Sequence, residues 1–161
     1  DAIALPGVGS FTASLERLDK VKDTLQTKIA DGTPLLGICL GMQLFFESSE
    51  EGPGMGLAFF KGTVKQLPST VKVPHMGWNT LNITRPNELF DGIPEGTYVY
   101  FVHSLYPAPT DPEVVVTKTE YGTTFTSAVV QKNIYGTQFH PEKSGDIGLA
   151  ILKNFAKIVV R

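Results

Sequence analysis

The spacing of apolar residues predicts a helix-rich first part of the chain. Apolar side chains recur at helical spacing between Ser10, which suits an N-cap, and the stop signal Asp31-Gly32. A short apolar run at 33–36 then predicts a buried strand, and the apolar positions within 42–46 predict a second helix directly after it. The predicted strand therefore turns into a helix within a few residues.

The second part of the chain has a different pattern. From about residue 57 to residue 138, short stretches rich in Val, Thr, Tyr and Phe alternate with turn clusters, which predicts a series of strands. A last amphipathic helix is predicted near 146–160. Helix and strand alternation followed by a β-rich half predicts an α/β sandwich, with a main sheet that is parallel near residues 33–36 and is flanked by helices.

Length and composition fit one domain over residues 1–161 and argue against several function classes. The chain has 42% hydrophobic residues, enough for one sizeable core, and a net charge of −2, which argues against nucleic acid or an anionic membrane as a partner. Its single cysteine rules out an internal disulfide and fits a reducing cytoplasm. No apolar run is long enough to span a bilayer. The single cysteine and the three histidines share no zinc-ligand spacing, so neither a metal nor another cofactor is expected.

Cys39 is the first candidate for chemistry, because it lies between Gly37 and Gly41 where the predicted strand turns into a helix. A bend of this kind strains its central residue and tolerates only minimal side chains two positions away. The start of a helix would stabilise a thiolate, and the backbone N–H of Leu40 would face an oxygen developing on an attacked carbonyl group. The alternative for a lone cysteine is a small buried hydrophobe.

A second cluster, His140-Pro141-Glu142, lies 101 residues beyond Cys39 and directly after an apolar stretch. The proline stiffens the segment, so Glu142 can accept the Nδ1–H of His140 and leave Nε2 free to take a proton from the cysteine. By itself the pair would be a surface histidine and glutamate beside a turn. Combined with a cysteine on a sharp bend, it predicts a nucleophile, a base and the group that orients the base.

The segment Leu5-Pro6-Gly7-Val8-Gly9-Ser10 follows a short apolar stretch and predicts a loop at the end of a strand. An amide of Val8 or Gly9 would join the Leu40 N–H as the two donors of an oxyanion hole. Alone, a Pro-Gly-x-Gly sequence is ordinary turn chemistry.

These segments, together with Glu50-Glu51 and the QFHPEKS stretch from Gln138, resemble the class I, triad-type glutamine amidotransferases, which release ammonia from glutamine. The resemblance runs from residue 5 to residue 144 and implies a flavodoxin-like sandwich with Cys39, His140 and Glu142 as the catalytic triad. Members of this family have a further βαβ unit before the glycine-rich loop, so this unit is expected to be missing from the chain.

The resemblance also implies where glutamine binds. Gln43 lies one helical turn after the nucleophile and faces the same side, and Glu51 is the candidate for the substrate ammonium group. The segment His103-Ser104-Leu105 resembles the one whose backbone groups bind glutamine, and Gly7 lies in the loop at the same site. The alternatives are a solvated acidic loop for Glu51 and a hydrogen-bonded strand-end histidine for His103.

Two further segments, Val73–Asn79 and Tyr100–Ser104, together with Lys143, resemble the glutaminase subunits of imidazole glycerol phosphate synthases. That resemblance implies a (β/α)8-barrel cyclase as the partner subunit, which uses the ammonia to form imidazole glycerol phosphate in histidine biosynthesis. The residues expected to contact this partner are Pro74, His75, Met76, Trp78, Asn79 and Lys143, the last through a salt bridge near the ammonia entrance. The alternatives are that Trp78 packs on its own domain and that Lys143 is only solvated.

Other functions stay open on the sequence. One is a stand-alone cysteine γ-glutamyl hydrolase or the glutaminase subunit of another amidotransferase, and another is a non-catalytic interaction module on the same fold. The intact Cys39, His140 and Glu142 disfavour the module, and the HPEKS and PHMGWN segments disfavour the stand-alone hydrolase.

Overall fold

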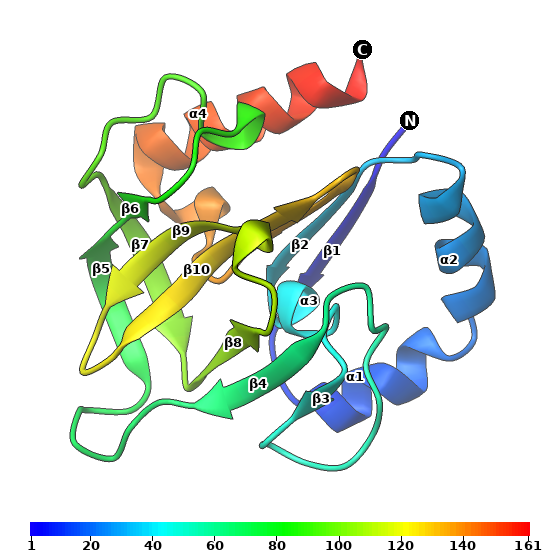
Figure 1. Ribbon diagram of the computed structural model, residues 1–161, viewed down its shortest axis with the longest axis horizontal. Helices are drawn as coiled ribbons and strands as arrows, with labels where there is room; N and C mark the ends of the chain where they lie inside the picture. Colours follow the sequence, from blue (N-terminus) through cyan, green and yellow to red (C-terminus); the bar gives the residue numbers. More distant parts are fainter.

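A computed structural model describes residues 1–161 (Figure 1). The strands are β1 (Ile3–Gly7), β2 (Leu35–Cys39), β3 (Ser48–Ser49), β4 (Gly62–Gln66), β5 (His75–Thr80), β6 (Asn82–Ile83), β7 (Tyr98–His103), β8 (Leu105–Pro109), β9 (Val115–Glu120), β10 (Thr124–Gln131) and β11 (Ile134–Thr137). The α-helices are α1 (Phe11–Leu18), α2 (Lys22–Ala30), α3 (Leu40–Gln43) and α4 (Gly145–Val159), and the short 3₁₀ helices are η1 (Glu88–Phe90), η2 (Pro112–Val114) and η3 (Pro141–Lys143).

The main sheet has six strands in the order β1-β2-β11-β10-β9-β6. Strands β1, β2 and β11 run parallel, whereas β10, β9 and β6 extend the sheet in antiparallel fashion. Two smaller sheets, β3-β4-β8 and β5-β7, complete the β-rich half. The expected α/β sandwich, with a parallel sheet around the bend and many strands after it, is confirmed.

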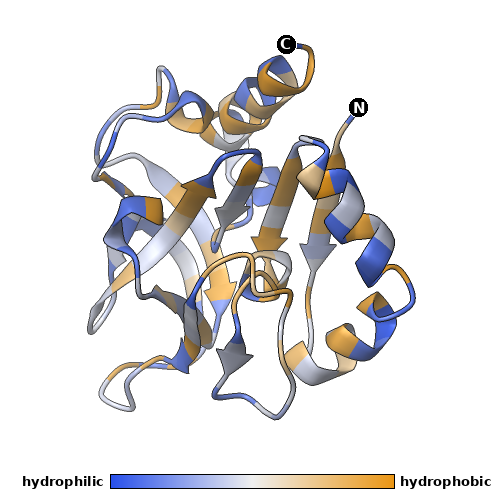
Figure 2. Cartoon of the chain, turned by 45° about the vertical axis from the view of Figure 1, so that its right-hand side comes forward, coloured by the Kyte–Doolittle hydropathy of each residue, from blue (hydrophilic) through white to orange (hydrophobic).

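Both faces of the main sheet are buried, because successive side chains of β2 point to opposite faces. Leu35 belongs to the core cluster that contains Leu25 and Ile29 of α2, whereas Leu36 belongs to the cluster that contains Ile151 and Phe155 of α4. Figure 1 accordingly shows α2 and α4 on different sides of the central strands. In Figure 2 the central strands are largely hydrophobic, whereas α4 carries both hydrophobic and hydrophilic residues, as a helix packed on one side requires.

The predicted long first helix is wrong in one respect, because it is divided into α1 and α2. Ser10 caps α1 as expected, since its Oγ accepts the Ala13 N–H at 3.3 Å. The helix is interrupted at Val21, whose φ of −121° is not helical. The two halves pack into different core clusters: Leu15 of α1 joins the one around Phe11, and α2 joins the one beneath β2. A single straight helix could not pack against both clusters.

The helix expected over 42–46 is also wrong, because α3 ends at Gln43 after one turn. The N–H groups of Phe45 and Phe46 bond to the carbonyl groups three residues earlier rather than four, which tightens the chain and takes it out of the helix. Both aromatic rings are then fully buried beneath the sheet. The last predicted helix is confirmed as α4, within one residue at each end.

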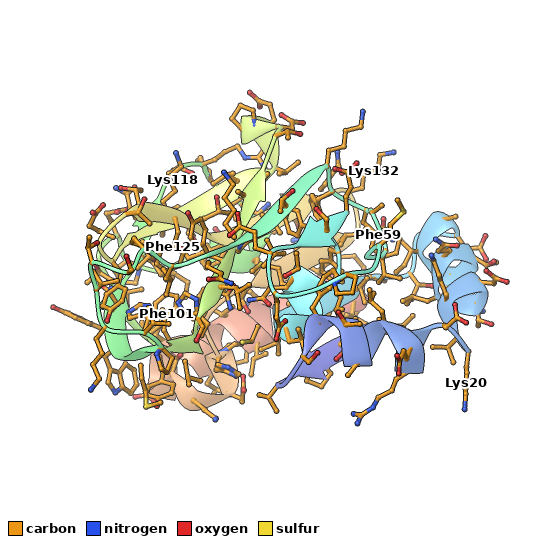
Figure 3. All side chains as sticks on the ribbon, turned by 90° about the horizontal axis from the view of Figure 1, so that it is seen from below. Lys20, Phe59, Phe101, Lys118, Phe125 and Lys132 are labelled. Carbon is orange, nitrogen blue, oxygen red and sulfur yellow. The ribbon has the colours of Figure 1, made fainter.

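Aromatic rings fill the space between the main sheet and the β5-β7 sheet. The ring centroids of Phe101 and Phe125 lie 5.7 Å apart in an edge-to-face arrangement. Figure 3 shows these two rings among the strands, with Lys20, Lys118 and Lys132 projecting at the periphery. None of the helices combines the length and the apolar character needed to cross a membrane.

Candidate active site

Cys39 ends β2 at a strained bend. Its φ of 55° and ψ of −112° are unusual for a residue with a side chain, and such a conformation costs on the order of 1–3 kcal/mol. The chain then enters α3 at once. The sequence therefore places the thiol on a sharp strand-to-helix turn, as expected.

The two flanking glycines are required by close contacts. A Cβ atom on Gly41 would collide with the carbonyl oxygen of Leu5 in β1, and one on Gly37 would collide with the ring of Phe45. Both contacts are with well-packed neighbours, so neither can move away cheaply. The bend thus depends on glycine at both positions.

His140 and Glu142 form a close pair, with Nδ1 and Oε1 2.6 Å apart. The imidazole is buried, and the backbone of His140 is held by its N–H bond to the Tyr100 carbonyl at 2.9 Å and by the Ser144 hydroxyl, which donates to the His140 carbonyl at 2.6 Å. Since Nδ1–H donates to the carboxylate, Nε2 is left as an acceptor, and it is buried without a hydrogen-bond partner.

The sulfur of Cys39 is not hydrogen-bonded to His140 in this structure. Its S–H faces the Val102 carbonyl oxygen at 3.8 Å, and Sγ accepts an amide N–H of Gln138 at 3.5 Å. Proton transfer to Nε2 therefore needs the contact between sulfur and imidazole to tighten, and such contacts often tighten only in the complex with substrate.

Burial raises the pKa of the Cys39 thiol to about 11, although the backbone N–H of Leu40 lowers it. The nearby charge of Glu142 raises it further, whereas the amide of Gln138 and the charge of Lys143 lower it. The structure differs here from the expected stabilised thiolate, because α3 is a single turn and the sulfur is removed from water. The resting group at neutral pH is the thiol.

A cavity of about 270 Å³ opens beside the sulfur, slightly smaller than most ligand sites. It is lined by Val8, Gly9, Cys39, Leu40, Gln43, Glu51, Val102, His103, Ser104 and Leu105. The fold thus brings the expected nucleophile, the oxyanion donors and most of the expected substrate-binding residues to one place. Gly7, His140, Glu142 and Lys143 line a second depression of about 260 Å³, which shares Val8 with the first.

Gln43 and Glu51 are both anchored by hydrogen bonds. The Gln43 amide nitrogen donates to the Leu105 carbonyl oxygen and to the side-chain oxygen of Gln138, at 3.1 Å each. The Glu51 carboxylate accepts the Phe11 N–H at the start of α1, at 2.8 Å. Gln138 was not among the predicted site residues. Its place in the QFHPEKS stretch, two residues before His140, was the only sequence signal, and its full burial is visible only in the structure.

The segment expected to face a partner forms β5, which pairs with β7. Met76 and Trp78 are 62% and 55% exposed, and the Trp78 ring contacts Tyr100 edge-to-face at 5.9 Å. The structure corrects the expectation that His75 contacts the partner, because its side chain is only 3% exposed and its ring stacks on Tyr121. Alternate side chains of a strand point to opposite faces, so His75 faces inward where Met76 and Trp78 face outward. Pro74 and Asn79 are half-buried, and Lys143 is exposed.

His75 and His103 form a buried pair, with Nδ1 of the first 2.9 Å from Nε2 of the second. The Nδ1–H of His103 donates to the Leu105 carbonyl oxygen at 2.7 Å. Burial lowers the pKa of each imidazole to about 4, so both rings are neutral at neutral pH.

Comparison with known proteins agrees with this geometry. The family model for glutamine amidotransferase class-I matches residues 1–159. This chain belongs to the class I glutamine amidotransferase family. It is 52% identical over 161 residues to the imidazole glycerol phosphate synthase subunit HisH of Archaeoglobus fulgidus, covering 99% of this chain and 80% of that protein. It is 49% identical over 160 residues to the HisH subunit of Pyrococcus furiosus, covering 98% and 82%.

Solved structures agree on the fold of this amidotransferase. A crystal structure of a glutamine amidotransferase aligns over 99% of this chain and 79% of that chain, with a TM-score of 0.73 and 19% identity. The structure of PurLQS from Thermotoga maritima aligns over 97% and 79%, with a TM-score of 0.72 and 17% identity. The predicted fold class is therefore confirmed.

Replacing Gly41 by alanine should destabilise this amidotransferase by about 3 kcal/mol or more, because the new methyl group collides with the Leu5 backbone. Denaturant unfolding measures the loss. Gly32→Ala is the control: it has open space around it, and even with its positive φ, a strain that Gly41 does not have, it should cost only about 1 kcal/mol. Equal losses in the two variants would show that the contact with Leu5 is unimportant.

Stability should fall as the pH drops from 6.5 towards 4. In this window the unfolded histidines bind protons, whereas His75 and His103 in the fold, with pKa values of about 4, do not. Their contribution to the slope is on the order of 2 kcal/mol per pH unit. Denaturant unfolding of the wild type and of the double variant His75→Gln/His103→Gln at several pH values should therefore give a flatter profile for the variant. Parallel profiles of unfolding free energy against pH would contradict the lowered pKa values of His75 and His103.

Proposed function

We propose that this chain is the glutaminase subunit of an imidazole glycerol phosphate synthase. It hydrolyses glutamine to glutamate and ammonia, and the ammonia is passed to a cyclase subunit that makes imidazole glycerol phosphate in histidine biosynthesis. The observation that carries the proposal is Cys39 at a strained bend, lining one cavity together with Val8, Gly9 and Leu40. The likeness to the HisH subunits over nearly the whole chain selects the pathway.

His140 starts the reaction by taking the thiol proton on Nε2, which Glu142 leaves free by holding Nδ1–H. The sulfur attacks the carboxamide carbon of glutamine. The oxyanion that forms accepts hydrogen bonds from the backbone N–H groups of Leu40 and of Val8 or Gly9. His140 returns its proton to the departing ammonia. A water that His140 activates then hydrolyses the γ-glutamyl thioester through a second oxyanion. Removing one oxyanion donor costs about 3 kcal/mol.

Because the pKa of the thiol is high, His140 has to accept the thiol proton before the sulfur can attack. Because the sulfur rests as the neutral thiol, attack requires the proton to move to the imidazole while glutamine occupies the cavity. The Val8 loop borders both the cavity beside the sulfur and the depression beside His140. Because this loop supplies an oxyanion donor, small movements of it would change turnover strongly.

Glutamine is held through its α-ammonium group and by the lining of the cavity. The Glu51 carboxylate, fixed by the Phe11 N–H, binds the substrate ammonium group. Gln43 and the backbone of His103, Ser104 and Leu105 line the rest of the cavity. Gly7 supports the loop next to the oxyanion donors.

The partner is a cyclase subunit with a (β/α)8 barrel that docks on β5 and on the region of Lys143. Met76 and Trp78 supply exposed apolar surface of the kind that anchors interfaces, and Pro74 and Asn79 flank them.

Ammonia in neutral water is mostly protonated and no longer nucleophilic, so a covered route to the cyclase has a chemical purpose. The depression lined by His140 and Lys143 is its start. The chain works as one domain over residues 1–161, in the reducing cytoplasm.

Cys39→Ala should abolish ammonia release from glutamine while leaving cyclase binding intact, because the sulfur is the nucleophile and is buried, whereas the proposed docking residues Met76 and Trp78 are exposed. Glutamine hydrolysis with and without the cyclase subunit and its ligand measures the first effect, and titration with the cyclase measures the second. Strong stimulation of the wild type is expected. Unstimulated turnover of γ-glutamyl peptides would instead select a stand-alone hydrolase, and lost binding in the variant would make Cys39 structural.

Trp78→Ala should weaken cyclase binding at least about tenfold, as removal of a large aromatic interface anchor does. Titration of cyclase against stimulated glutaminase activity measures it, and full stimulation should return at high cyclase concentration. Leu149→Ala is the control, because this side chain is also about half exposed but lies on α4. Equal affinities for Trp78→Ala and wild type would exclude β5 from the interface.

A further inference from the structure

The side chain of Gln138 touches the candidate nucleophile and has no part in the reaction described above. It is 0% exposed and lies between β11 and η3. Its amide nitrogen is 3.5 Å from Cys39 Sγ, and its amide oxygen is 3.1 Å from the amide nitrogen of Gln43. This buried amide therefore has a hydrogen-bond partner at each end, as buried polar groups generally do.

The orientation of this amide is set by a backbone carbonyl group. The Leu105 oxygen can only accept, so Gln43 must turn its NH₂ group towards it. The second N–H of that group then points at Gln138, which must present its oxygen. Gln138 is left with its NH₂ group towards the sulfur. A reversed amide would place two NH₂ groups against each other.

The Leu105 carbonyl is itself held by the histidine pair. It also accepts the Nδ1–H of His103 at 2.7 Å. The Nε2 of His103 faces Nδ1 of His75 at 2.9 Å, and the Asn79 amide nitrogen lies 3.3 Å from Nε2 of His75. The histidine side and the Gln43 side therefore meet at the Leu105 oxygen, which accepts a hydrogen bond from each.

We propose that Gln138 is a positioning residue that favours the thiolate of Cys39 by donating an amide N–H to its sulfur, in an orientation that Gln43 and the Leu105 carbonyl impose. An N–H bond to sulfur strengthens when the sulfur becomes an anion, so it stabilises the attacking form. The S–H of the resting thiol faces Val102, which leaves sulfur lone pairs for Gln138. The inference rests on the proposed function only in treating Cys39 as the nucleophile.

Other charged or titratable groups surround the sulfur, but none has this role. Glu142 and Lys143 of η3 act on the thiol through their charges and in opposite directions. Glu51 lines the cavity and is bonded to Phe11, and His103 is committed to Leu105. The imidazole of His140 makes no bond to the sulfur.

Because Cys39 is the only cysteine, its alkylation by iodoacetamide reports on this sulfur alone. Gln138→Met removes the donor and keeps an unbranched side chain of similar length. The alkylation rate at a fixed pH near 8 should fall about tenfold, which corresponds to a thiol pKa raised by about one unit. Gln131→Met is the matched control, because Gln131 is exposed at the end of β10, and its rate should equal that of the wild type.

Gln43→Glu tests the orientation itself. A carboxylate only accepts hydrogen bonds, so Gln138 should turn its NH₂ group to it and present its oxygen to the sulfur. Alkylation should fall although Gln43 does not bond to the sulfur, and in the Gln138→Met background the same change should have much less effect. Equal losses in both backgrounds would show that the carboxylate acts through its charge alone, and would overturn the imposed orientation.

A folded Gln138→Met protein that alkylates at the wild-type rate would overturn the proposal. If that variant does not fold, Gln138→Glu keeps the size of the side chain and puts a carboxylate oxygen against the sulfur, so it should slow alkylation more than tenfold; an unchanged rate would again overturn the proposal. The alkylation rates are measured without glutamine, so they do not depend on glutaminase activity. A wild type without glutaminase activity but with the expected alkylation pattern would refute the proposed function and leave the role of Gln138 standing.

Discussion

The structure depends on how closely the backbone approaches itself around Cys39. Gly41 lies against the Leu5 carbonyl of the neighbouring strand, and Gly37 lies against the ring of Phe45. These contacts hold Cys39 at positive φ and bring the loop after β1, with Val8 and Gly9, beside the thiol. The parallel pairing of β1 with β2, in which Gly7 is opposite Cys39, is what makes this approach possible.

The same packing sets the chemistry of the sulfur. Removing the thiol from water raises its pKa, so the fold supplies groups that act in the other direction, namely the Leu40 N–H and the Gln138 amide. His140, the proposed base, is oriented by Glu142 and makes no hydrogen bond to the sulfur. Under the proposed function, the thiol of Cys39 stays protonated until substrate and base are both in place.

The β5-β7 sheet joins the exposed surface to the cavity. Met76 and Trp78 point outward from β5, whereas His75 on the same strand points inward and reaches His103 on β7. His103 in turn holds the Leu105 carbonyl that anchors Gln43. A series of hydrogen bonds therefore runs from β5, which carries the proposed partner face, through β7 and the start of β8 to the cavity beside Cys39.

Features that depend on local chemistry could be predicted from the residues alone: a cysteine between two glycines where a strand ends, a proline-stiffened His140-Glu142 pair, the Ser10 cap and the alternation that gives an α/β fold with a β-rich second half. Prediction from the sequence failed where packing partners decide. The first helix is divided because its halves serve different core clusters, α3 ends early because Phe45 and Phe46 turn under the sheet, and His75 is buried because of its place on β5. The protonation of Cys39 and the role of Gln138 depend on burial and on contacts between residues distant in the chain, so only the tertiary structure decided them.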